Sequence, residues 1–223
     1  VREVLEAQAD AMDLPLLSRS ASWDDYERGM IGLLRETRTC GAAAAVFGEE
    51  TGQVLAMVGS IDYNLVVPTK TKGQTGNLVD GQVNVTTRER QPGSALKPFT
   101  YALAFESGFT PASVLPDIPS HFPTAVRGVL YSPRNYDGKF HGPLLARRAL
   151  GGSQNVPAVA LASKVGVPPI SRLLRRAGMT TFDKTADHYG LGLTLGNAEV
   201  RLDELVAAYA AIARGGELVR TTM

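Results

Sequence analysis

Residues 90–99 read RQPGSALKPF, a stretch that predicts the start of a helix and points to a chemistry. It contains the only S-x-x-K pattern of the chain, formed by Ser94 and Lys97. On a helix, residues three positions apart lie on one face, about 5–6 Å apart, so the lysine amine comes within reach of the serine hydroxyl. A serine hydroxyl is a poor nucleophile until an adjacent base takes its proton. The pair is therefore a candidate nucleophile and base.

A lysine acts as a base only when it is neutral, and its ordinary pKa is about 10.4. Burial and a nearby helix N-terminus both disfavour the charged ammonium. Pro98 predicts such an N-terminus, because it has no N–H for the Ser94 carbonyl and this is tolerable only in a first turn. We expect a helix over residues 94–107, whose free N–H groups could also stabilise an oxyanion. The alternative is that two common residues stand at a common spacing without any chemistry.

The only S-x-N pattern is formed by Ser153 and Asn155, after the pair Gly151-Gly152 and just before a predicted helix. A hydroxyl and a carboxamide that project from one loop could relay a proton and hold a peptide carbonyl. Ser and Asn are also preferred at helix N-caps. Taken alone, the tripeptide is better interpreted as a cap.

The elements around these motifs indicate a mixed fold. Residues 42–59 read AAAAVFG, EETG and QVLAMVG, which predicts a β-hairpin with both faces covered. Residues 60–92 and 111–142 show little periodicity, and we expect long loops there. Helices are expected over residues 2–12, 23–38, 143–150, 157–165, 168–177 and 201–214, and residues 216–223 look like the start of a strand.

Composition excludes several classes of protein. The chain has 223 residues, 44% hydrophobic and 20% charged, which is ordinary for a globular protein. A net charge of +1 gives no strong positive potential that would attract nucleic acid, and we expect no nucleic-acid partner. The single cysteine, Cys40, excludes an internal disulfide. Three histidines without an HExxH pattern argue against a zinc hydrolase, and we expect neither metal nor cofactor.

Taken together, the motifs resemble a known family. S-x-x-K followed by S-x-N is typical of penicillin-binding proteins and class A β-lactamases, in which K-T-G comes later. Residues 90–99 resemble the nucleophile segment of class A penicillin-binding proteins, and GQVLAMVGS at 52–60 is similar to a strand of their hairpin. Residues 186–216 are most similar to the 1C branch of that family. The resemblance covers about residues 41–216.

This resemblance implies a bacterial, extracytoplasmic D,D-transpeptidase domain of α/β fold, with a central antiparallel sheet flanked by helices. The family's serine attacks the D-Ala-D-Ala bond of peptidoglycan stem peptides, and β-lactams acylate the same serine. Carried over by motif, Ser94 is the nucleophile and Lys97 its base. Ser153 passes a proton to the leaving nitrogen, and Asn155 binds the substrate amide and orients Lys97. We expect a linker or helical segment at 1–39 and the transpeptidase domain at 40–223.

The third motif of the family is absent after Ser153. Lys184-Thr185-Ala186 differs from K-T-G at one position, but it precedes a helical region, so we do not assign it as the third motif. We therefore expect the C-terminal strands to be missing and the 223-residue form to be inactive, with membrane attachment only through an anchor outside it. Two alternatives stay open: a β-lactamase or D,D-carboxypeptidase of the same fold, and a non-catalytic module that senses β-lactams or peptidoglycan.

Overall fold

The structure is a computed structural model that describes residues 43–48, 50–60, 62–64, 66–68, 77–124, 126 and 128–222. The described chain divides into two compact units, one of residues up to 88 together with 209–223, the other of residues 89–208. The helices expected at 2–12 and 23–38, and the linker expected at 1–39, lie outside the described residues. No helix among the described residues is long and apolar enough to cross a membrane.

The first unit contains the predicted hairpin. Strand β1 (Ala44–Phe47) pairs antiparallel with β2 (Val54–Val58), which confirms the hairpin. The expectation that both of its faces are covered is wrong, since Val46 is 40% exposed and Leu55 is 61% exposed. The chain end is also extended, because Thr222 forms a parallel bridge with Gln53. The long loop expected at 60–92 is wrong in part, since β3 (Val66–Pro68) pairs with β4 (Asn77–Asp80). Strands of three and four residues are too short to show a period in the sequence.

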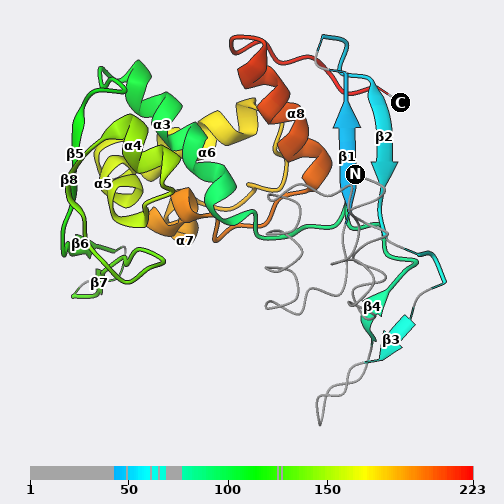
Figure 1. Ribbon diagram of the computed structural model, residues 1–223, viewed down its shortest axis with the longest axis horizontal. Helices are drawn as coiled ribbons and strands as arrows, with labels where there is room; N and C mark the ends of the chain where they lie inside the picture. The colour runs from blue at the N-terminus through cyan, green and yellow to red at the C-terminus, as the bar shows by residue number, and fades with distance from the viewer. Residues whose placement is uncertain are drawn as a thin grey trace, which may run out of the picture. The chain divides into compact units, whose positions relative to one another are not determined.

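The second unit is mainly helical (Figure 1). Its elements confirm the helices predicted at 94–107, 143–150, 157–165, 168–177 and 201–214. They are the 3-10 helix η3 (Gly93–Leu96), α3 (Lys97–Glu106), α4 (Ala146–Gly151), α5 (Asn155–Val165), α6 (Val167–Arg176), α7 (Ala186–Tyr189), the 3-10 helix η4 (Leu191–Leu195) and α8 (Leu202–Ala213). Helix α8 begins in this unit and ends in the first.

The loop expected at 111–142 is also wrong in part. Strand β5 (Val114–Asp117) pairs antiparallel with β8 (Gly142–Leu145), and β6 (Phe122–Pro123) pairs with β7 (Leu130–Tyr131). These ribbons have two strands each, so every strand has an edge that needs no hydrogen-bond donor, and proline is tolerated there. The prolines that suggested a loop therefore lie within or beside short strands.

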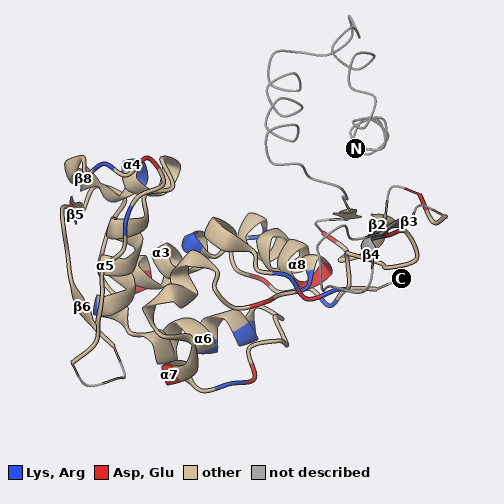
Figure 2. Ribbon diagram, turned by 90° about the horizontal axis from the view of Figure 1, so that it is seen from below, with Lys and Arg blue, Asp and Glu red and all other residues tan. Residues whose placement is uncertain are grey.

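Helix α5 is the centre of the second unit, between α3, α4 and α6 (Figure 1). Its residues from Val156 to Ala162 are all buried, as expected for a helix that is apolar on every side. Helix α6 is instead amphipathic. It buries Ile170 and Leu174 and carries basic residues in its last turn, coloured blue in Figure 2. The sequence around Ser94 thus folds onto a rigid helical core.

A close backbone approach fixes the turn that precedes Ser94. Gly196, at the end of η4, has a φ of +77°, and a Cβ atom there would overlap the main chain of Gly93. Only glycine combines this left-handed conformation with the lack of a side chain. The contact therefore links the C-terminal end of η4 to the residue next to the candidate nucleophile.

Gly196→Ala is expected to lower the free energy of unfolding by about 2–5 kcal/mol, since it adds a steric clash to an unfavourable φ. Gly108→Ala is the matched control, because Gly108 has a φ of +96° but open space around it. That variant should lose only about 1–2 kcal/mol. Urea unfolding followed by circular dichroism measures both, and equal losses would contradict the role given to the Gly93 contact.

Candidate active site

Ser94 and Lys97 lie at the junction of η3 and α3. Ser94 is exposed, whereas Lys97 is only 1% exposed. The Lys97 N–H donates to the Ser94 carbonyl in a 3-10 turn. This bond takes the place of the one that Pro98 cannot form, so the predicted helix begins with a tighter turn and becomes α-helical at Lys97. The junction leaves the hydroxyl-bearing residue at the surface and the amine-bearing residue inside.

The amine of Lys97 binds the second motif. Its Nζ atom lies 2.6 Å from Asn155 Oδ1 and 3.2 Å from Ser153 Oγ, and it also donates to the Ser153 main-chain carbonyl. The structure therefore brings together Lys97, Ser153 and Asn155. Among the described residues, none of the hydrogen bonds of this amine goes to Ser94. Catalytic hydrogen bonds often tighten only when substrate is bound.

Burial sets the protonation of Lys97. It lowers the pKa of Lys97 from 10.5 to about 8, because the ammonium loses water there. Within the described part of the chain, no carboxylate pairs with this amine, so only neutral oxygens offset the loss. At pH 7 about one-tenth of such a lysine is neutral, against about one in three thousand at the ordinary value. The site therefore increases the share of the neutral form, which can accept a proton, while the charged form still predominates at pH 7.

Ser153 adopts an unusual backbone conformation between α4 and α5. Its φ is +52°, and it is the only residue other than glycine with a positive φ in the described ranges. Residues held in such conformations cluster at functional sites. Here the conformation accompanies a tight turn in which both the hydroxyl and the carbonyl of Ser153 contact the Lys97 amine.

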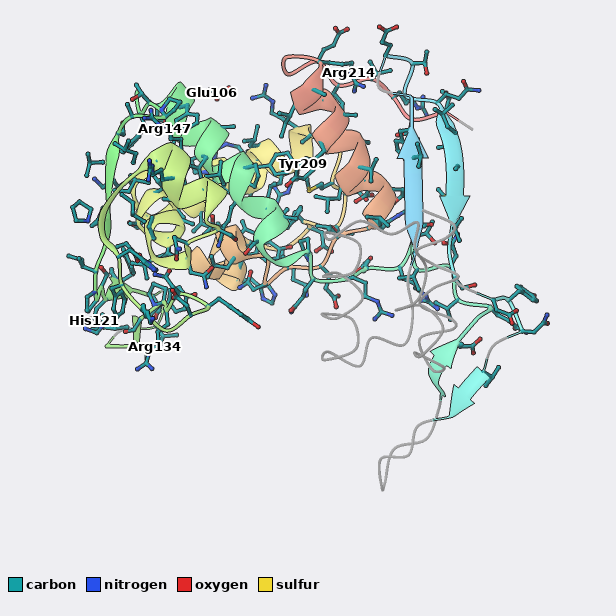
Figure 3. The ribbon with its side chains drawn as sticks, in the orientation of Figure 1. Glu106, His121, Arg134, Arg147, Tyr209 and Arg214 are labelled. Carbon is teal, nitrogen blue, oxygen red and sulfur yellow. The ribbon has the colours of Figure 1, made fainter. Side chains whose placement is uncertain are left out.

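Asn155 is the first residue of α5 and does not cap it. The N-cap position belongs to Gln154, which makes no side-chain capping bond. The interpretation of Ser153 and Asn155 as a helix cap is therefore wrong. The Asn155 side chain instead donates from Nδ2 to the Arg134 carbonyl at 2.8 Å, while Oδ1 accepts from Lys97. Arg134, labelled in Figure 3, lies on the loop between β7 and β8.

A buried polar cluster behind Asn155 was missed by sequence reasoning. Asn135, 5% exposed, accepts the main-chain N–H groups of Asn155 and Val156 at its Oδ1 atom. Its Nδ2 atom donates to both oxygens of Asp117, which is fully buried on β5. The available signal was an asparagine in the turn-rich segment 132–138, which also fits an ordinary loop.

His141 extends this cluster to the surface. Its Nδ1 atom lies 2.8 Å from Asp117 Oδ2, and its Nε2 atom lies 3.1 Å from Asp137 Oδ2. The hydrogen bond to Asp117 raises the pKa of His141, with Asp137 adding to the effect. Tyr101, one turn after Lys97 on α3, is buried, and burial together with the Asp117 charge raises the pKa of its phenol. The phenol therefore stays neutral.

Comparison with known proteins identifies the family of the chain. The sequence model of the family described as the penicillin binding protein transpeptidase domain matches residues 42–223. The chain therefore belongs to the penicillin-binding protein transpeptidase domain family. The match spans both motifs and the hairpin, and the fold class expected from the sequence, the serine penicillin-recognising α/β fold, is confirmed.

Individual relatives are class A penicillin-binding proteins. Penicillin-binding protein 1C of Escherichia coli (strain K12) is 38% identical over 74% of this chain and 19% of its own length. Penicillin-binding protein 1A of Rickettsia conorii is 33% identical over 83% of this chain and 21% of its own length. The crystal structure of penicillin-binding protein 1A from Haemophilus influenzae is 28% identical, with a TM-score of 0.68 over 82% of this chain and 24% of that one. The chain thus spans about a fifth of these relatives.

The amine of Lys97 is expected to titrate near pH 8 in the folded protein. Because its pKa is lowered by folding, the unfolded chain holds this proton up to about pH 10.5, so the contribution of Lys97 to the free energy of unfolding rises as pH increases from 8 to 10.5. Nuclear magnetic resonance of protein labelled with ¹⁵N-lysine, with Lys97→Met to assign the signal, measures it. A midpoint at or above 10.5 would contradict burial as the controlling factor.

Proposed function

We propose that this chain forms the acylation site of a serine D,D-transpeptidase that cross-links peptidoglycan. The observation that carries the proposal is the buried Lys97, three residues after the exposed Ser94, with a lowered pKa and an amine bound to Ser153 and Asn155. A nucleophile beside a neutral base is what serine acyl transfer requires. Family membership supports the same reaction class.

In the proposed acylation, Ser94 Oγ attacks the carbonyl carbon of the D-Ala-D-Ala bond of a stem peptide. Neutral Lys97 accepts the hydroxyl proton as the new C–O bond forms. The C–N bond then breaks, and the proton reaches the leaving nitrogen through Ser153, whose hydroxyl lies 3.2 Å from the lysine amine. Free D-alanine departs, and the acyl group stays on Ser94 as an ester.

In the second half of the reaction, an amine of another stem peptide attacks this ester. The amine loses a proton to the lysine as its C–N bond forms, and the ester C–O bond to Ser94 then breaks. The lysine returns the proton to the Ser94 oxygen, and a new amide joins the two peptides. Asn155 is proposed to bind the amide of the substrate while it holds Lys97 through Oδ1. β-Lactams mimic the dipeptide and acylate the same hydroxyl. The substrate places this domain on the outer side of the cytoplasmic membrane, and no nucleic acid takes part.

The relatives named above do not favour the other functions considered. Both are named penicillin-binding proteins. A β-lactamase also needs a base that activates water for deacylation, and the motifs supply none beyond Lys97. A module that bound peptidoglycan without being acylated would not need a lysine with a lowered pKa.

The full-length protein that carries this sequence is expected to gain the mass of one penicillin molecule at Ser94. Intact-mass spectrometry followed by peptide mapping detects the adduct, and Ser94→Ala should show none because it lacks the attacking oxygen. An adduct that persists on the alanine variant, or a folded full-length protein that gains no mass, would refute the proposed function.

Lys97→Arg is expected to slow acylation at least a thousandfold, since a guanidinium stays protonated near neutral pH and cannot accept the serine proton. The time course of labelling with a fluorescent penicillin measures the rate. The control is Lys164→Arg, a lysine on α5 whose amine lies over the Phe109 ring. Near-normal acylation of Lys97→Arg would remove Lys97 from the role of base.

A further inference from the structure

The start of α5 is held from outside the helix. The first N–H groups of a helix have no partner within it and are usually bound by the N-cap side chain. Here the N-cap Gln154 makes no such bond, and Asn135 Oδ1 accepts the N–H groups of Asn155 at 2.8 Å and Val156 at 3.2 Å. A side chain twenty residues upstream thus fixes the position of the main chain that carries Asn155.

The same segment also fixes the orientation of the Asn155 amide. An amide group has a donor end and an acceptor end, and which end faces a neighbour follows from its partners. The Arg134 carbonyl accepts only, so it must face Nδ2, at 2.8 Å. Oδ1 is then the end directed at the Lys97 amine, at 2.6 Å. Residues 134 and 135 together determine which atom Lys97 meets.

Asn135 is itself immobilised by buried partners. Its Nδ2 atom donates to Asp117 Oδ1 at 2.7 Å, to Asp117 Oδ2 at 2.9 Å and to the Lys139 carbonyl at 2.8 Å. Asp117 in turn accepts from the main-chain N–H of His141 at 3.0 Å and contacts its ring at 2.8 Å. A buried carboxylate persists only when its oxygens are satisfied in this way. The cluster therefore has little freedom to rearrange.

We propose that Asn135, anchored by Asp117, is a positioning residue that sets the geometry of Asn155 and, through it, of the Lys97 amine. This inference rests on the proposed function, and it concerns residues that lie outside both sequence motifs. Asn135 does not touch the reacting atoms. It acts through the hydrogen bonds that it makes with α5 and β5.

The test compares Asn135→Ala with Asn197→Ala, which removes an exposed asparagine amide, in the full-length protein. Asn197 also uses its amide to bind a main-chain carbonyl, that of Tyr189 at 2.9 Å, without contacting Lys97, Ser153 or Asn155. Labelling with a fluorescent penicillin gives two quantities. The final stoichiometry reports the folded fraction, and the rate constant reports the geometry of the site. A purely structural role would lower the stoichiometry and leave the rate constant unchanged.

We expect Asn135→Ala to lower the acylation rate constant at least tenfold in the protein that remains folded, and Asn197→Ala to change it less than twofold. A second readout does not depend on penicillin. Modification of Lys97 by an amine-reactive reagent, quantified by peptide mass spectrometry, should be about tenfold faster in Asn135→Ala and unchanged in the control. An unaltered rate constant together with unaltered Lys97 reactivity overturns the inference. If the wild type gains no adduct, the proposed function fails, and the lysine reactivity still decides the inference.

Exchanging the amide and the carboxylate between residues 117 and 135 gives a second test, which applies even if Asn135→Ala does not fold. N135D alone sets two carboxylates against each other in a buried site, and it should slow acylation strongly. In D117N/N135D, the new amide can donate to the new carboxylate and still accept from His141, and the carboxylate can accept the N–H groups of α5. The acylation rate constant of the double variant should therefore be at least tenfold higher than that of N135D alone. A double variant as slow as N135D would count against Asn135 and Asp117 acting as a pair.

Discussion

The site depends on the burial of one amine without a counter-charge. Lys97 is 1% exposed, and its three hydrogen-bond acceptors are neutral oxygens from Ser153 and Asn155. A carboxylate at this position would hold the proton on the lysine and raise its pKa. Neutral acceptors hold the side chain in place while leaving its pKa near 8, so a base becomes available close to neutral pH.

Secondary structure delivers these groups with few degrees of freedom. The 3-10 turn and Pro98 start α3, and they direct Lys97 inward while Ser94 stays exposed. The left-handed backbone at Ser153 turns the chain so that two of its oxygens meet the same amine. Helices α3 and α5 then pack against each other, and both contribute residues to two buried hydrophobic clusters. Because rigid elements carry the site, its distances are set by packing that extends well beyond the motifs.

The sequence predictions were accurate for elements held by local interactions and failed where residues far apart in the sequence pair. Helices α5 and α6 and the hairpin β1–β2 were predictable, since their patterns are local and several residues long. The pairing of β5 with β8 joins residues 114–117 to residues 142–145 through strands rich in Pro and Gly, and no local pattern reveals it. The predicted domain boundary at residue 40 remains a prediction. In the site, the two motifs were recognised, but the supporting Asn135 and Asp117 were not.

By itself, the sequence determined the chemical groups and their local spacing: a serine and a lysine one turn apart, a second serine and an asparagine, and the proline that begins the helix. The tertiary structure decided which of these groups meet. It joined Lys97 to residues 56 and 58 positions further along the chain, and it assigned the N–H groups at the start of α5 to Asn135 rather than to a cap. The physical reason is that spacing along a helix fixes neighbours only within a few residues. Burial, desolvation and long-range hydrogen bonds arise only when distant segments pack together.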